Sequence, residues 1–314
     1  MIRTPLCDLL GIEYPIFQGG MAWIADAKLA AAVSNGGGLG VIAAGNAPGE
    51  YVREQIRLAK SQTDKPFGVN VMLMSPFADE IAEILIEEKV PVVTTGAGNP
   101  SKYMKRWTEA GIHVIPVVAS VALAKLMTRL GASALIAEGG ESGGHVGDLT
   151  TMVLVPQVCD ATNLPVIAAG GIADGRGIAA AFMLGATGIQ VGTRFLVAEE
   201  CSAHRTHKEK ILAANDISTT VTGKRLGHPV RSLKTPFTRE YTKAEYSSIS
   251  DEELEAMGAG KLRLAAQEGD VQQGCFLAGQ VVGMIHKEQP AAEIIREMFA
   301  EAEPILKGAD KWVK

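Results

Sequence analysis

Eight short apolar runs, about 20 to 30 residues apart, constrain the fold of this chain more than any other feature of its sequence. The segments between the runs are amphipathic and rich in Ala, Leu, Lys and Glu. This spacing is what a strand, a crossover helix and two short loops require. Strands that are apolar on both faces are typical of a parallel sheet. The runs occupy residues 14–18, 39–43, 67–71, 90–94, 114–118, 134–137, 165–169 and 188–192.

These repeated units predict an α/β protein, a (β/α)8 TIM barrel, in which reactive groups gather where the strands end. An open parallel sheet with a topological switch point is the alternative. Hydrophobic residues make up 47% of the chain and aromatic residues only 5%, so the core must consist of small aliphatic side chains. Such side chains suit stacked layers of helices around a sheet.

The eighth run ends near Phe195, and the 119 residues beyond it are more than one closing helix uses. We therefore predict a barrel over residues 1–205, completed by C-terminal helices within 276–314. Residues 206–275 are predicted to form a small lid that controls substrate access.

The predicted lid and the residues after it contain three segments of different composition. Residues 204–243 carry nine Lys or Arg against three Asp or Glu and contain several Gly and Pro, which predicts a basic, loop-rich segment. Residues 251–268 are predicted to form one helix, which begins at Ser250 or Asp251. Residues 276–306 have helical periodicity interrupted at Pro290 and are expected to pack back on the barrel.

Charge, cysteines and hydropathy exclude several classes of protein. A net charge of −5 argues against nucleic acid as the main partner, because neutralising phosphates needs a basic face. The four cysteines lack the spacing of a metal site or a disulfide framework, so no metal ligand is predicted. No apolar stretch resembles a signal peptide or reaches 18 residues, which predicts a cytoplasmic protein that does not contact the membrane.

The loop at residues 138–148 (EGGESGGHVGD) follows the sixth run and places one histidine, His145, among five glycines. Glycine lets backbone N–H groups approach a ligand closely. An imidazole can donate or accept a proton near neutral pH. His145 is therefore the predicted catalytic residue, and an incidental histidine in a surface loop is the alternative.

Two further glycine clusters follow the seventh and eighth runs, 22 residues apart: Gly170-Gly171 and Gly192-Thr193. Neighbouring strand ends of this kind often hold a phosphate through backbone N–H groups. Tight turns with Asp174 as a helix cap are the alternative. Earlier strand ends add the small residues of 19–22 and two amides at Asn46 and Asn70. The ligand should thus be large, flat and phosphorylated. FMN fits this description, and another mononucleotide is the alternative.

The motif at residues 18–23 (QGGMAW) and the glycine-rich segment 29–40 resemble the flavin-dependent enoyl-acyl-carrier-protein reductases, often called type II. The segments 141–147, 169–172, 190–195 and 274–280 extend the resemblance to nearly the whole chain. Nitronate monooxygenases are also similar and share the Gly-Gly-His loop. They tend to carry Ala-Pro-Met-Ala-Gly where this chain has Gly-Gly-Met-Ala-Trp, which favours the reductases.

The resemblance implies bound FMN, reduction by NADH or NADPH, and reduction of a trans-2-enoyl thioester on an acyl carrier protein in fatty acid biosynthesis. It also implies a homodimer and activation by a monovalent cation. The alternative is a nitronate monooxygenase, which oxidises nitronates with O2. The cofactor contacts expected from the motifs and the strand ends are Gly20, Met21, Ala22, Asn46, Asn70, Glu138, Ser142, Gly143, Gly144, Gly147, Ala169, Gly170, Gly171, Gln190, Gly192 and Thr193.

The basic segment gains a role under the reductase interpretation, because acyl carrier proteins are strongly acidic. An ordinary solvated face is the alternative. Three histidines, His204, His207 and His228, are predicted to be surface side chains. A dehydrogenase of the inosine-monophosphate type would need a cysteine nucleophile where His145 stands, and no feature favours a non-catalytic sensor. The predicted docking residues are Arg205, Lys224, Arg225, Arg231 and Lys234.

Overall fold

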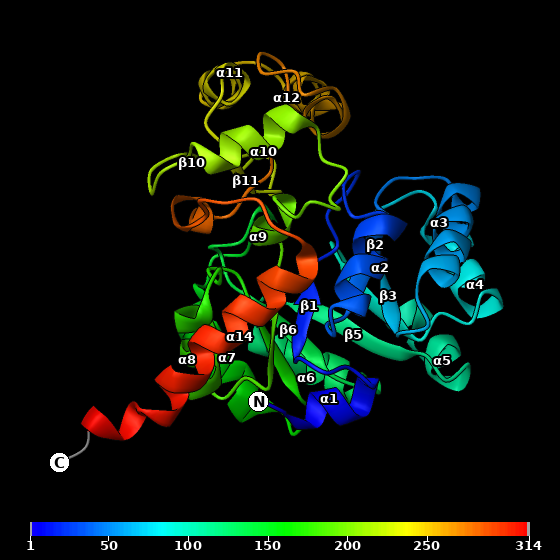
Figure 1. The fold of residues 1–314 in the computed structure, drawn as a ribbon. Coiled ribbons are helices and arrows are strands. Elements are labelled where there is room, and N and C mark those ends of the chain that lie inside the picture. Colours follow the sequence, from blue (N-terminus) through cyan, green and yellow to red (C-terminus); the bar gives the residue numbers. More distant parts are fainter. Residues whose placement is uncertain (1, 313–314) are drawn as a thin grey trace.

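The computed structural model describes residues 2–312 and shows a barrel of eight parallel strands surrounded by helices (Figure 1). The strand order is β1-β9-β8-β6-β5-β4-β3-β2. The ring closes where Gln18 N donates to Leu39 O at 3.0 Å and Leu39 N donates to Ile16 O at 2.8 Å, which joins β1 to the residue before β2. The predicted TIM barrel is confirmed, and the open-sheet alternative is wrong.

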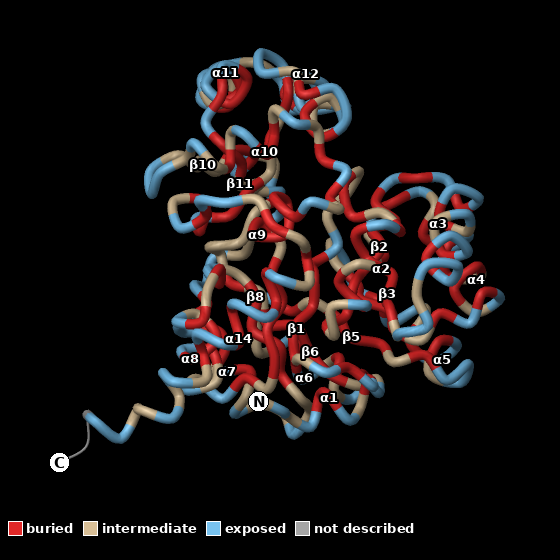
Figure 2. Tube along the Cα trace, in the orientation of Figure 1, coloured by how far each residue is buried: buried red, intermediate tan, exposed pale blue. Residues whose placement is uncertain are grey.

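Every predicted run overlaps one barrel strand. The strands are short and almost wholly buried, because side chains of one face fill the barrel and those of the other contact the helices. Figure 2 shows this buried interior beneath a mostly exposed outer layer. The strands are β1 (Ile16–Gln18), β2 (Gly40–Ala43), β3 (Phe67–Met72), β4 (Val92–Gly96), β5 (His113–Val118), β6 (Leu135–Glu138), β8 (Val166–Ala169) and β9 (Gly188–Val191).

The helices that follow the strands form the outer layer. The N-terminal α1 (Pro5–Leu10) instead closes the bottom of the barrel, where its Leu6 and Leu10 join the interior core. The last long helix, α14 (Ala291–Lys307), packs against α8 and α2, so the C-terminal stretch returns to the barrel as expected. The remaining barrel helices are α2 (Ala27–Asn35), α3 (Gly49–Gln62), α4 (Ala78–Glu87), α5 (Ser101–Glu109), α6 (Val121–Arg129), α7 (Thr151–Ala161), α8 (Gly175–Met183) and α9 (Thr193–Leu196).

A second, smaller layer lies over one end of the barrel (Figure 1). It has its own core of Phe237, Tyr241 and Leu254. We call residues 206–275 the lid; its boundaries remain a prediction, as does the 276–314 segment, of which 313 and 314 lie outside the described residues. The elements of this part and the C-terminus are α10 (Arg205–Leu212), β10 (Thr219–Thr222), β11 (Val230–Leu233), α11 (Pro236–Glu245), α12 (Asp251–Gly258), α13 (Lys261–Arg263), η1 (Leu264–Glu268), η2 (Gln280–Met284) and η3 (Ala309–Trp312).

Two predictions for the lid are wrong. Residues 204–243 are not loop-rich, since they form two helices and the hairpin β10–β11. The single helix over 251–268 begins at Ser250 as expected, with a capping box to Glu253, but α12 ends at Gly258. Gly260 then takes the left-handed conformation, φ +74°, before the chain resumes as α13 and a π-helical turn. Glycine is a poor helix former, and only glycine adopts this φ without strain.

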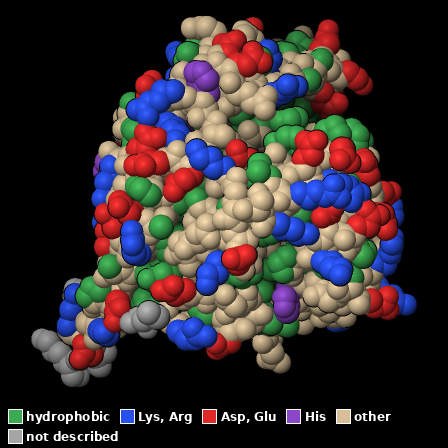
Figure 3. All heavy atoms as spheres, turned by 45° about the vertical axis from the view of Figure 1, so that its right-hand side comes forward, with side chains coloured by type: hydrophobic (Ala, Val, Ile, Leu, Met, Phe, Trp, Pro, Cys, Tyr) green, Lys and Arg blue, Asp and Glu red, His purple; other side chains and the backbone are tan. Residues whose placement is uncertain are grey.

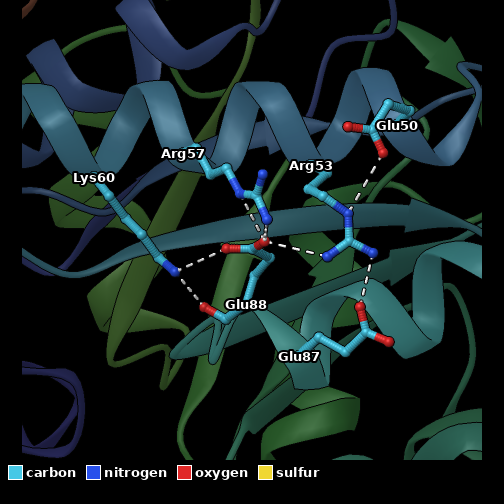
Figure 4. Close-up of polar contacts among 6 residues, drawn as sticks. All are labelled: Glu50, Arg53, Arg57, Lys60, Glu87 and Glu88. Carbon is cyan, nitrogen blue, oxygen red and sulfur yellow. Dashed lines mark hydrogen bonds and ion pairs between the residues drawn. The ribbon is translucent and has the colours of Figure 1, made fainter.

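The carboxylate of Glu88, at the end of α4, joins α4 to α3 through ion pairs with three basic side chains of α3 (Figure 4). Its Oε1 lies 2.8 Å from Arg57 Nη2 and 3.2 Å from Arg53 Nη1, and its Oε2 lies 3.3 Å from Lys60 Nζ. Only 10% of the Glu88 side chain is exposed. Burial alone would raise the pKa of this carboxyl, but the hydrogen bonds from Arg57, Arg53 and Lys60 lower it.

A Glu88→Gln substitution is expected to lower the free energy of unfolding by about 1–3 kcal/mol at pH 7, because three donors lose their shared charge. The pKa of Glu88 is lowered on folding, so its stabilising effect is complete above the unfolded pKa and disappears as the pH falls through the folded one. Urea denaturation at pH 7 and pH 3 measures both effects. Glu87→Gln is the control: this exposed carboxylate pairs with Arg53, and its loss should change stability by less than about 1 kcal/mol.

Candidate active site

A cavity of about 680 Å³ opens between the carboxyl ends of the strands and the lid. It brings His145 together with all but one of the predicted cofactor contacts, from the end of β1 to the start of α9. The exception is Asn46, which is exposed and lines a neighbouring cavity of about 280 Å³. The structure therefore separates Asn46 from the other predicted residues.

The glycine-rich loop after β6 is held in place by the lid. Residues Gly144–His145 form a short strand, β7, which pairs antiparallel with β11, so that His145 lies opposite Val230. Val146 N donates to Pro229 O at 3.0 Å. This pairing was not predicted, because a two-residue strand carries no periodicity that a sequence could reveal.

Arg231 on β11 fixes the same loop through its guanidinium. Its Nη2 and Nε donate to the carbonyl of Gly140 at 2.9 and 3.2 Å. Burial lowers the pKa of Arg231, and Glu141 opposes that effect. The prediction that Arg231 belongs to an exposed docking surface is therefore wrong, since this side chain positions the loop that carries His145.

The imidazole of His145 lies at the mouth of the cavity, where part of it still meets solvent. His228, in the turn between β10 and β11, lines the same mouth. The surroundings lower the pKa of His145 from its ordinary value, chiefly by burial and further by repulsion from His228. A lowered pKa favours the neutral imidazole, which has one N–H donor and one acceptor nitrogen.

Glu138 ends β6 and places a carboxyl in the cavity wall. Burial raises the pKa of Glu138 to about 7, although the side chain of Ser142 opposes part of the shift. The Oγ of Ser142 is itself buried and has no well-aligned hydrogen-bond partner among residues 2–312. A buried carboxyl and hydroxyl with so few partners are typical of a site that a polar ligand completes.

Flavin-free Glu138→Gln protein is expected to lose less stability than the wild type when the pH rises from 5 to 8. The pKa of Glu138 is raised from 4.5 to about 7 on folding, so its stabilising effect is complete below the unfolded pKa and is lost as the pH rises through about 7. The loss corresponds to at most about 3 kcal/mol. Urea denaturation at both pH values measures it, with the exposed Glu109→Gln as control; identical pH dependence in the Glu138→Gln and wild-type proteins would contradict the prediction.

The glycines after β8 and β9 leave donors and space at the strand ends. Gly170 and Gly171 have φ of +90° and +74°, and the backbone N–H groups of Gly170, Gly171 and Gly192 donate to no other atom of residues 2–312. A Cβ at Gly192 would meet only Met21 Sδ, at 3.8 Å. Asp174 also caps α8, as the alternative interpretation expected, so these turns combine a cap with a cluster of free donors suited to an anion.

Two amides lie among these donors. Asn70 on β3 donates from Nδ2 to Thr94 Oγ1 at 3.0 Å, which leaves its Oδ1 as an acceptor. Gln190 on β9 is only 9% exposed, and its amide makes no hydrogen bond within the described chain. A Cβ at Gly20 would lie 2.4 Å from Asn70 Cβ, which is too close for any side chain. Position 20, just after β1, therefore requires glycine.

The C-terminal segment before η2 closes the site from the side. Gly279 N donates to Thr193 Oγ1, and Gln280 N donates to Glu141 O, both at 2.9 Å. The Glu141 carboxylate accepts from Thr151 N at 2.9 Å. No role was predicted for Glu141, Thr151 or Gly279, although the motifs 141–147, 190–195 and 274–280 contain residues on both sides of this contact.

The other predicted docking residues and histidines differ in their surroundings. Lys224 and Lys234 are exposed, whereas Arg225 donates to backbone carbonyls of the lid. Arg205 pairs with Glu209 and Glu288.

The prediction that His207 lies on the surface is wrong. The imidazole of His207 is fully buried, and its Nε2 lies 3.2 Å from Leu277 O. Burial lowers the pKa of His207 to about 4. His204 is half-buried and caps α10.

Comparison with known proteins identifies the family. A family model described as nitronate monooxygenase matches residues 3–84 and 74–301. The chain belongs to the nitronate monooxygenase family. Within residues 2–312 of this family member, no helix has the length and apolar character that crossing a membrane would need.

Relatives of this family member have names that describe different activities. It is 50% identical to FabK from Thermotoga maritima over the full length of both chains, with a TM-score of 0.97. It is 41% identical over 237 residues to a "(3aS,4S,5R,7aS)-5-hydroxy-7a-methyl-1-oxo-octahydro-1H-indene-4-carboxyl-CoA dehydrogenase" of Mycobacterium tuberculosis, a match that covers 74% of this chain and 67% of the relative. A "Probable nitronate monooxygenase" of Staphylococcus saprophyticus is 30% identical over 97% of this chain and 99% of its own. These matches confirm the resemblance expected from the motifs, and the relatives are oxidoreductases.

Proposed function

We propose that this protein is an FMN-dependent enoyl-acyl-carrier-protein reductase, which uses NADH or NADPH to reduce trans-2-enoyl thioesters in fatty acid biosynthesis. The observation that carries the proposal is the two-part lining of the cavity. Glycine N–H groups and amides line its floor at the strand ends, whereas apolar side chains such as Phe237, Tyr241 and Leu262 line its lid side. The floor suits a flat phosphorylated cofactor and the lid side suits an acyl chain. The full-length identity to FabK supports the same activity.

The residues at the strand ends fit the proposed cofactor. The free N–H groups near Gly170, Gly171 and Gly192 would hold its phosphate, because a cluster of N–H groups binds anions. The amides of Asn70 and Gln190 would pair with polar atoms of its ring, as would the buried hydroxyl of Ser142. When bound, FMN supplies hydride transfer between a nicotinamide nucleotide and a carbon–carbon double bond.

His145 would act on the thioester rather than on the cofactor. Negative charge develops on the thioester oxygen when the β-carbon is reduced, and a donor aimed at that oxygen lowers the barrier. The N–H of the neutral imidazole can supply this donor, and the protonated imidazolium can pass its extra proton to the α-carbon and return to the neutral form. Arg231 and β11 hold the loop that carries His145 in place.

The proposal retains several predictions about partners. The exposed side chains of Lys224 and Lys234 remain candidates for docking an acidic acyl carrier protein. The homodimer, the monovalent cation and the cytoplasmic location remain predictions from the sequence.

Nitronate monooxygenation is the second candidate, because the matching family model carries that description. In this reaction His145 would help to deprotonate a nitroalkane or would orient a nitronate, and O2 would reoxidise the flavin. The same imidazole therefore has a role in both candidates, so its position does not discriminate between them.

Mixing the purified holoenzyme with substrates of both reactions tests the proposal. Anaerobically, NADH or NADPH should bleach the flavin absorbance rapidly, and crotonyl thioester should then restore it. In air, a nitronate should cause little oxygen uptake. Fast oxygen uptake with nitronate, together with sluggish bleaching by either nucleotide, would overturn the reductase in favour of the monooxygenase.

A further inference from the structure

The lid side of the cavity is built by residues that also form the core of the lid. Phe237 and Tyr241 on α11 are 5% and 7% exposed and pack with Leu254 on α12, yet both line the cavity. Leu262 and Leu277 line it beside them. The wall is therefore apolar and is supported from behind.

The segment 258–263, where the predicted helix breaks, is held on both sides. The Lys261 ammonium lies 5.6 Å from the centre of the Phe237 ring within the lid. The Arg263 guanidinium lies 5.4 Å from the centre of the Trp23 ring on the barrel. Two cation–π contacts thus flank Leu262, which faces the cavity between them. This part of the wall has a defined position between lid and barrel.

Gly258, the last residue of α12, leaves a gap in this wall. It lines the cavity and is exposed, so it stands where the lid end of the cavity meets solvent. A Cβ built at Gly258 would meet only Tyr241 Cε2, at 3.7 Å, which is ordinary contact distance. Its φ lies outside the left-handed region, so the backbone would accept a larger residue.

We propose that Gly258 sets the upper length of the acyl chain: the distal part of the chain lies along Tyr241 and leaves the lid through the gap at Gly258. The inference rests on the proposed function and deepens it by naming a specificity-determining residue. His145 and Gly258 line the same cavity, so a thioester held at the imidazole can send its chain toward the gap. No Asp, Glu, Lys or Arg side chain lines the lid part of this cavity, which favours an alkyl chain over a charged substrate.

Gly258→Leu should therefore shorten the accepted chain. Excluding about three methylenes from an apolar site should raise the KM of a dodecenoyl thioester about 50-fold. Crotonyl thioester, whose chain does not reach the gap, should keep its kcat and KM. Binding of saturated dodecanoyl-CoA, followed by the change in flavin absorbance, should weaken by a similar factor without any turnover.

Two control variants separate this effect from general damage to the lid. Gly258→Ala adds only a Cβ at ordinary contact distance and should leave both substrates unaffected. Glu255→Leu adds the same leucine to an exposed position of α12 that does not line the cavity and should also change nothing. Thermal unfolding of each holoenzyme checks the fold. The unfolding temperature should not fall, because leucine has a higher helix propensity than the glycine it replaces.

The outcomes distinguish this inference from the proposed function. Equal loss of crotonyl and dodecenoyl turnover in Gly258→Leu, or no change in either, would overturn the role of Gly258 while the reductase function stands. If the wild type reduces neither thioester, the proposed function fails, and the chain-length inference fails with it.

Discussion

His145→Ala protein is expected to keep its flavin and its fold and to turn over enoyl thioesters about a hundredfold or more slowly. Removing one donor from a site of developing negative charge has effects of that size. The fold should survive, because the side chain is exposed at the cavity mouth and β7 pairs with β11 through backbone groups. Steady-state kinetics with crotonyl thioester, together with the flavin content, measure both parts of the prediction.

A matched control for this experiment is His228→Ala, which removes the other imidazole at the cavity mouth. His228 lowers the pKa of His145, so its removal should raise that pKa and move the acid limb of the pH–rate profile to higher pH. Turnover at pH 8 should stay near that of the wild type. Unimpaired turnover in His145→Ala would remove His145 from the mechanism.

Gly192→Leu is expected to weaken FMN binding about 5- to 150-fold while leaving the flavin-free fold intact. The backbone at Gly192, with φ −108°, accepts any residue, and a Cβ there contacts only Met21 Sδ, so the new side chain would extend into the cavity. Overpacking a site by such a side chain costs about 1–3 kcal/mol, which corresponds to this loss of affinity. Titration of flavin-free protein with FMN, followed by flavin fluorescence, measures it.

A graded series makes this experiment decisive. Gly192→Ala should weaken binding less than Gly192→Leu, because it adds only the Cβ. The flavin-free proteins should unfold within about 0.5 kcal/mol of the wild type, as expected for a substitution into open space. Wild-type affinity in Gly192→Leu would show that the cofactor does not lie against this strand end.

Much of the fold could be predicted from the chain because its signals are local. Each strand of a parallel barrel is buried on both faces, so it appears in the sequence as a short apolar run that a glycine or polar residue ends. The lid was less predictable. Residues 251–268 have the composition of one helix, and the left-handed Gly260 divides it; likewise, glycines and prolines in 204–243 suggested loops but lie around a hairpin.

The candidate site followed from the same logic only in part. Residues directly after strands could be assigned to one face, since all carboxyl ends of a parallel barrel lie together. Asn46 also follows a strand in the sequence. It nevertheless lines a separate cavity and not the one that contains His145. Arg231 was predicted to lie on an exposed docking surface because it is charged. In the structure its guanidinium instead donates to Gly140 O.

By itself, the sequence determined the eight strands, the glycine clusters at their ends and the family, because each of these depends on residues that are close together in the sequence. The tertiary structure decided how the parts meet: β7 pairs with β11, Arg231 holds the loop of His145, and Gly258 faces a cavity that begins at the barrel. The β7–β11 pairing and the Arg231–Gly140 hydrogen bond join residues 85 to 91 positions apart. No local periodicity specifies them, since they form only when the burial of apolar surface brings the lid and the barrel together.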